Sequence, residues 1–123
     1  MKRNDDLIRD ILLALEAQPA GELLDSNDLN FDGHSSSEIH EHCTLLEEAG
    51  FITVFAHVRG GYTLERLTMA GHDYLANIRE PTRWGRIKSA AAAAGGAGFE
   101  TFAFIAKRLA TQEMGDALDK LQG

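Results

Sequence analysis

Residues 51–68 read FITVFAHVRGGYTLERLT, and this stretch decides the fold. Two runs rich in β-branched and aromatic residues, 51–58 and 62–67, flank the pair Gly60-Gly61. A glycine pair between such runs is a hairpin signal, because glycine adopts the positive φ angles that tight turns require. We therefore expect a β-hairpin here.

Helices are predicted on both sides of this hairpin. Ser35 precedes Glu38 by three residues, the spacing of a capping box in which each side chain accepts the other residue's backbone N–H, so a helix is predicted over 36–49. Thr68 caps a further predicted helix, whose stripe is Met69, His72, Leu75 and Ile78. An amphipathic helix is predicted over 5–17 after the cap Asn4, from the spacing of Leu7, Ile8, Ile11, Leu12 and Leu15.

Residues outside these elements have weaker signals. Residues 22–33 show no clean period and predict only short extended pieces, and Trp84 and Ile87 mark a short helix. Residues 89–98 contain only Ser, Ala and Gly, which predicts a fraying helix end and a flexible joint. A last helix follows from Phe99. The expected core contains Ile11, Ile39, Leu46, Leu67 and Leu75.

The order of these elements predicts an α+β fold with a winged-helix-like domain. The hairpin is the wing, and the helix at 36–49 takes the position of the recognition helix. The predicted organisation is a winged-helix-like domain over 1–88, a flexible joint over 89–98 and an extra C-terminal helix over 99–123. The usual scaffold has an additional helix between the first helix and the recognition helix, but residues 22–33, which occupy this place, do not have a helical pattern.

Composition and charge limit the functional classes. The single cysteine, Cys43, excludes an internal disulfide and a cysteine-rich zinc site, and it fits a reducing compartment. Acidic residues interrupt the N-terminal apolar stretch, and no run approaches the roughly 20 apolar residues of a spanning helix. We therefore expect a cytoplasmic protein with no membrane partner.

No catalytic or cofactor chemistry is predicted. His40, His42 and Cys43 match no known metal-ligand spacing, so core packing explains His42 and Cys43 better than a metal site does. Cys43 is also a poor nucleophile, because it lies mid-helix in an acidic environment that favours the thiol. The glycines at 95, 96 and 98 lack the Lys-Ser/Thr of a phosphate loop. We expect a protein that is not an enzyme, without metal or cofactor.

Two motifs resemble those of bacterial winged-helix proteins. Residues 45–52, LLEEAGFI, resemble a recognition helix that runs into its wing, and residues 67–75, LTMAGHDYL, resemble the start of the helix after the wing. Together with Met1-Lys2-Arg3, His42 and the stretch from Ile78-Arg79 to Thr82-Arg83-Trp84, the chain resembles the uncharacterised bacterial and phage family known as domain of unknown function 2513. The resemblance covers about residues 1–90 and implies the fold, without a particular activity.

Charge distribution leaves two functions open. No Lys or Arg occurs between Asp10 and Val58, a stretch with ten acidic residues. A DNA-reading helix needs cations for phosphates, so we favour a regulatory module that binds a protein partner, in a phage or prophage setting, through the acidic face Glu38, Glu41, Glu47 and Glu48. The alternative is a DNA-binding transcriptional regulator whose contacts are Arg59, Arg66, Arg79, Arg83, Arg86 and Lys88. For Arg79 and Arg83, pairing with Glu80 or Asp73 is the simpler explanation.

The C-terminal helix carries an apolar stripe after the predicted joint. Such a stripe must fold back onto its own chain or pack on another copy. We expect a homodimer whose candidate contacts are Phe99, Phe102, Ile105 and Leu109.

Overall fold

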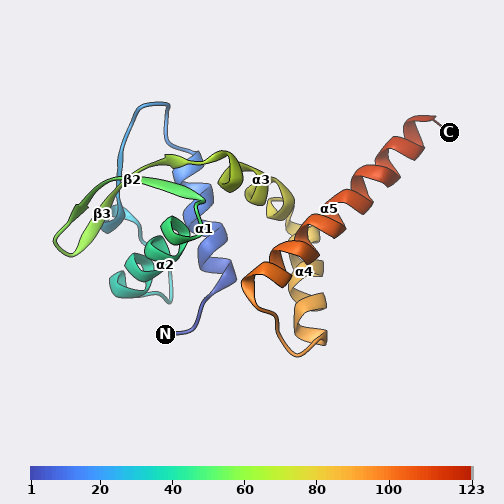
Figure 1. Cartoon of the computed structure of the whole chain (residues 1–123), viewed down its shortest axis with the longest axis horizontal. Helices are drawn as coiled ribbons and strands as arrows, with labels where there is room; N and C mark the ends of the chain where they lie inside the picture. Colours follow the sequence, from blue (N-terminus) through green and yellow to red (C-terminus); the bar gives the residue numbers. More distant parts are fainter. Residues whose placement is uncertain (123) are drawn as a thin grey trace. The chain divides into compact units, whose positions relative to one another are not determined.

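Within residues 1–122, which the computed structural model describes, five α-helices accompany a three-stranded antiparallel sheet (Figure 1). In chain order the elements are α1 (Asp5–Glu16), β1 (Leu24–Asp25), the 3₁₀ turn η1 (Ser26–Asp28), α2 (Ser36–Glu48), β2 (Ile52–Val58), β3 (Gly61–Leu67), α3 (Met69–Ile78), α4 (Pro81–Ala93) and α5 (Phe99–Gln122). The predicted α+β class is confirmed.

The chain divides within α3 into two compact units, Met1–Asp73 and the residues from Tyr74 onward. This division differs from the predicted boundary at residue 88. The reason is local packing, because α4 contacts α5 in the second unit, whereas the sequence pattern had grouped α4 with the hairpin.

In the first unit, α1 and α2 bury their apolar stripes. Asn4 Oδ1 accepts the Leu7 N–H at 3.0 Å and starts α1, as the sequence predicts. Ser35 Oγ likewise accepts the Glu38 N–H at 3.1 Å and starts α2. The buried residues of the two helices are Leu7, Ile8, Ile11, Leu12 and Leu15 in α1, and Ile39, His42, Cys43 and Leu46 in α2.

The sheet has the strand order β1-β3-β2, so β3 lies in the middle. Leu24 of β1 pairs with Leu64, and β2 pairs with β3 from Ile52↔Leu67 to Val58↔Gly61. Two register shifts leave Phe55 and Glu65 without a partner in this ladder. Such bulges redirect side chains, and Phe55 is 64% exposed.

The hairpin turn is one residue earlier than predicted. Gly60 has φ +80° and lies in the turn, but Gly61 is the first residue of β3. A Cβ at Gly61 would meet Asn27 Nδ2 at 2.7 Å and Ser26 Oγ at 2.8 Å. Gly61 therefore makes room for η1, and Ser26 Oγ also accepts the Tyr62 N–H at 2.8 Å.

The start of α3 is anchored to the residue that precedes β2. The Thr68 N–H donates to Phe51 O at 2.9 Å, and Thr68 Oγ1 accepts the Gly71 N–H at 3.1 Å. A Cβ at Gly71 would lie 2.0 Å from Phe51 O. The backbone approaches so closely here that only glycine fits.

In the second unit, α4 and α5 pack through aromatic residues. Glu80 caps α4 by accepting the N–H groups of Thr82 at 2.9 Å and Arg83 at 2.7 Å. The Trp84 and Phe102 rings meet edge to face with centroids 5.6 Å apart. Helix α4 continues through Ala93, so the helix end predicted within 89–98 lies at this residue, and residues 94–98 connect α4 to α5.

The five residues that were predicted to form the core are all buried. Their exposed fractions do not exceed 3%, and they are Ile11, Ile39, Leu46, Leu67 and Leu75.

Candidate functional site

The exposed side of α2 carries two glutamates that point away from the core. Glu41 and Glu48 are exposed, and their spacing of seven residues places them on one side of the helix. Glu38 and Glu47 are only half-exposed. The predicted acidic face therefore consists of two exposed glutamates, Glu41 and Glu48, and two half-exposed ones, Glu38 and Glu47.

The two flanking glutamates are held by histidines. His34 Nδ1 lies 3.1 Å from Glu38 Oε2, and His57 Nε2 lies 3.1 Å from Glu47 Oε1. The hydrogen bond from His34 lowers the pKa of the Glu38 carboxyl. The backbone N–H of Ser35 also lowers this pKa, so the Glu38 carboxylate interacts with the cap residue as the capping box predicts, and it binds His34 in addition.

An aromatic cluster joins α2 to the hairpin, and the sequence reasoning missed it. The His40 and Tyr62 rings stack with centroids 4.4 Å apart, and His57 meets Tyr62 edge-on at 4.9 Å. Tyr62 OH and Thr44 Oγ1 are 2.7 Å apart. No fixed spacing in the sequence links these residues, since they come from α2 and two different strands. The cluster fixes the hairpin beside the exposed side of α2.

His42 and Cys43 lie under that surface, in the core. The Asn4 N–H donates to His42 Nε2 at 2.9 Å, so Nδ1 carries the proton and donates to Glu38 O at 2.7 Å. Burial raises the pKa of the Cys43 thiol to about 12, so it is protonated at neutral pH. In the part of the chain that the structure describes, no three His, Cys, Asp or Glu side chains are grouped to hold a metal ion.

Two of the predicted DNA contacts lie on the hairpin. Arg59 is exposed in the turn between β2 and β3. Arg66 is exposed on β3, where its guanidinium donates to Leu67 O at 3.0 Å. A hollow of about 420 Å³ beside it is lined by Gly21, Leu23, Phe55, Glu65 and Arg66.

The basic residues of α4 are partly neutralised within the second unit. Arg83 Nε lies 2.8 Å from Glu113 Oε2, and an Arg86 guanidinium nitrogen lies 2.9 Å from Glu113 Oε1. This corrects the expected pairing of Arg83 with Glu80 or Asp73, because Glu80 caps the helix instead. Lys88 Nζ lies 5.6 Å from the Trp84 ring centroid, and Arg79 is exposed.

The predicted self-association stripe is not an exposed patch. Phe102 is 3% exposed and meets the Trp84 ring edge to face, and Phe99 contacts Tyr74 with ring centroids 5.3 Å apart. Ile105 and Leu109 are half-buried. The stripe folds back within its own unit, which was one of the two possibilities that the sequence left open. Dimerisation through these residues stays a prediction.

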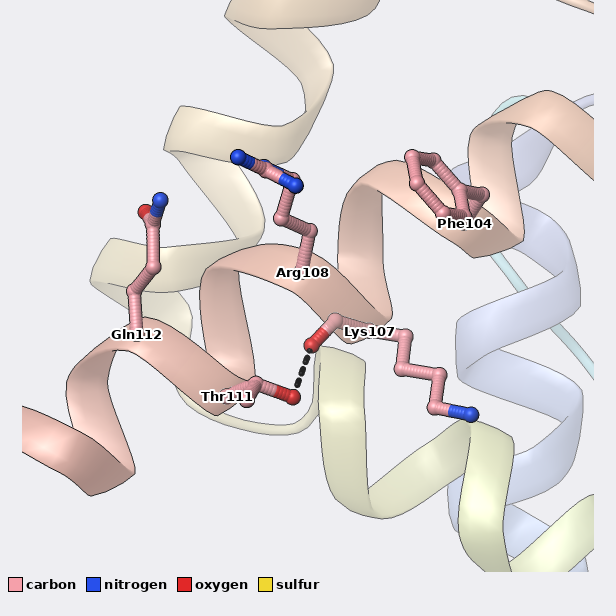
Figure 2. A pocket seen from close by; sticks show the side chains of 5 residues that line it. All are labelled: Phe104, Lys107, Arg108, Thr111 and Gln112. Carbon is pink, nitrogen blue, oxygen red and sulfur yellow. Dashed lines mark hydrogen bonds between the residues drawn. The ribbon is translucent and has the colours of Figure 1, made fainter.

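A different side of α5 is open. Figure 2 shows five of its side chains, which line a hollow of about 440 Å³: Phe104, Lys107, Arg108, Thr111 and Gln112. Thr111 Oγ1 donates to Lys107 O at 2.7 Å. Phe104 is 61% exposed, so a large ring faces solvent at the edge of this hollow.

No helix within residues 1–122 is long and apolar enough to span a membrane. Residues 2–97 match a family described as "Hypothetical protein (DUF2513)". An "Uncharacterized protein" of Haemophilus influenzae is 39% identical over 94 residues, which cover 72% of this chain and 77% of that protein. No solved structure matches the chain. The family match covers more than half of the chain and spans α1 to α4, so this chain belongs to the DUF2513 family of hypothetical proteins.

Proposed function

We propose that this protein is a non-enzymatic regulatory module, built on a winged-helix scaffold, that binds a protein partner through the exposed side of α2. The observation that carries the proposal is the chemistry of that side. Glu41 and Glu48 project into solvent, and the nearest cations in the sequence are Arg9 and Arg59.

The arrangement of the first unit supports the scaffold. Helix, short strand, helix, hairpin and helix follow one another, and β3 returns between β1 and β2. The turn η1 stands where the usual scaffold has a further helix. In this comparison α2 takes the recognition-helix position and β2–β3 is the wing.

Electrostatics favour a protein partner over DNA. A helix that enters the major groove must offset phosphate repulsion, and α2 has no Lys or Arg with which to do so, whereas Glu41 and Glu48 are exposed on it. Of the basic residues proposed for the alternative, Arg83 and Arg86 already bind Glu113. A basic protein surface, such as one that otherwise contacts nucleic acid, is the complementary partner.

Charge reversal tests this proposal. Replacing Glu41 and Glu48 by Lys removes the repulsion and adds two cations, so this variant should gain salt-dependent affinity for a labelled DNA duplex that the parent lacks. Fluorescence anisotropy at about 50 and 200 mM salt measures it. The matched control is Glu22→Lys with Asp32→Lys, which makes the same charge change on exposed loop residues and should bind DNA more weakly.

The second part of the test measures whether the charge-reversed variant loses a protein partner. A partner that the parent captures from a host extract should be lost with Glu41→Lys and Glu48→Lys and retained with the control pair. Equal retention by both variants would contradict a role for α2.

The DNA-binding regulator stays the second candidate, and the hairpin favours it. Arg59 is exposed in its turn, and Arg66 and Lys88 are exposed as well. The parent could instead bind one DNA sequence tightly near physiological salt and lose this binding with Arg59→Ala or Arg66→Ala. In that case the hairpin recognises the DNA, and the protein-binding proposal is wrong.

A further inference from the structure

Within residues 10–58, a positive side-chain charge can come only from histidine. This stretch has no Lys or Arg, and its four histidines are His34, His40, His42 and His57. Histidine changes its charge between about pH 5 and 8, whereas Lys and Arg keep theirs. The net charge around α2 therefore depends on pH in a way that it would not if lysines or arginines held the glutamates.

Two of the four histidines cannot gain a proton without a loss of hydrogen bonding. His42 Nε2 accepts the Asn4 N–H at 2.9 Å while Nδ1 donates to Glu38 O at 2.7 Å, so a proton on Nε2 would break the first bond. The His40 ring stacks on Tyr62, and its buried Nδ1 has no hydrogen-bond partner among residues 1–122. A charged ring would leave this N–H unsatisfied. The charge change is therefore expected at the other two histidines.

His34 lies close to carboxylates of two helices. Its Nδ1 is 3.1 Å from Glu38 Oε2 in the first turn of α2, and this hydrogen bond lowers the pKa of the Glu38 carboxyl. On α1, burial raises the pKa of the Asp10 carboxyl, and the charges of Arg9 and His34 act against this rise. A proton gained by His34 therefore places a positive charge beside both Glu38 and Asp10.

His57 connects the hairpin to the last turn of α2. Its Nε2 lies 3.1 Å from Glu47 Oε1, and its ring meets Tyr62 of β3 edge-on with centroids 4.9 Å apart. Each residue turns a helix by about 100°, which places the two histidine–glutamate pairs on opposite sides of the exposed Glu41 and Glu48. A partner that covers the exposed glutamates therefore meets one pair at each edge.

We propose that His34 and His57 make partner binding through α2 dependent on pH, an inference that rests on the proposed function. With both rings neutral, every glutamate of the acidic face presents its negative charge to a basic partner. With both rings protonated, Glu38 and Glu47 are neutralised, and a cation of the partner must displace a histidine to reach either of them. Affinity for the partner therefore rises with pH across the range in which histidine titrates.

The coupling between protons and partner is reciprocal. If protonation weakens partner binding, the bound partner must favour the neutral rings to the same extent. Binding at about pH 6.5 should therefore release protons. Calorimetry in two buffers of different ionisation enthalpy measures this release.

Binding of a basic peptide at two pH values tests the proposal. The probe is a fluorescently labelled peptide of alternating Arg and Gly with blocked termini, whose own charge is constant between about pH 5.5 and 8. At about 50 mM salt, the full-length parent should bind it about fivefold or more weakly at the lower pH, because two cations then stand beside the contact. His34→Asn with His57→Gln keeps a neutral N–H in place of each bonded ring nitrogen. This variant should change its affinity by less than about twofold and release no protons.

The matched control is His72→Gln. His72 is exposed on α3, so this change removes a titrating ring away from the acidic face and should leave the pH dependence of the parent unchanged. Equal pH dependence of the parent and the His34/His57 variant would overturn this inference. The proposed function would still stand if the peptide bound and Glu41→Lys with Glu48→Lys abolished the binding. A parent that binds the peptide at neither pH, or a Glu41/Glu48 variant that binds it like the parent, would overturn the proposed function and this inference with it.

Discussion

At the scale of single residues, His42 shows how a polar side chain is accommodated in the core. Its ring accepts the Asn4 N–H and donates to Glu38 O, so it connects the start of α1 to α2. Both bonds use one neutral tautomer. The residue is buried completely, so these bonds replace the water that the ring and the Asn4 N–H lose on folding.

Replacing His42 by Phe keeps the size of the side chain and removes the acceptor. We expect a loss of about 1–3 kcal/mol in the free energy of unfolding, because the Asn4 N–H is left without its acceptor. Urea denaturation measures it. His72→Phe is the control, since His72 is exposed and its replacement should change stability by less than about 0.5 kcal/mol.

Cys43 gives a prediction at alkaline pH. Burial raises the pKa of its thiol from 9.0 to about 12, so between these values the unfolded chain loses the proton and the folded chain keeps it. The stability that this group contributes is complete below pH 9.0 and falls as the pH rises toward 12. The urea midpoint of the parent should therefore fall more between pH 8 and about pH 10.5 than that of Cys43→Ala. Equal falls would show that the thiol is not shielded.

At the scale of elements, replacing a glycine by alanine should have opposite effects on stability in α3 and in α4. Gly71→Ala would place a Cβ 2.0 Å from Phe51 O and should cost about 3 kcal/mol or more, since backbone must move. Gly85 lies in α4 with nothing within 4 Å of a Cβ. Gly85→Ala should therefore stabilise the protein by about 0.5–1 kcal/mol, because alanine has the higher helix propensity. Thermal unfolding of the two variants distinguishes the effects by sign.

Elements whose signals are local could be predicted from the sequence. Asn4 and Ser35 cap their helices as expected, because a cap acts over three residues. The hairpin was predicted with its turn displaced, because the packing of Asn27 and Ser26 against Gly61 is not local. Likewise, a helix end followed by a joint was predicted for the Ala/Gly stretch 89–98, but its composition did not give the residue, Ala93, at which α4 ends.

At the scale of the whole molecule, the two units differ in net charge. Met1–Asp73 contains fourteen acidic and five basic residues, whereas the part from Tyr74 onward contains five acidic and seven basic ones. This charge asymmetry can be seen in the sequence. The ion-pair partner of each charged residue cannot, since Glu113 follows Arg83 by thirty residues and His57 pairs with Glu47 from a different element. The glutamate face of α2 was therefore predicted as one patch, although two of its four members are paired.

The hydrogen bond between Thr68 and Phe51 has an evolutionary consequence. It ties the two ends of the hairpin together, so the chain enters and leaves residues 52–67 at one point, while Tyr62 and His57 hold the strands against α2. Insertions or deletions at Arg59-Gly60 can therefore accumulate among descendants without displacing α2 or α3. The exposed turn is therefore the part of the hairpin whose length can change, while the strand residues that contact α2 and η1 stay as they are.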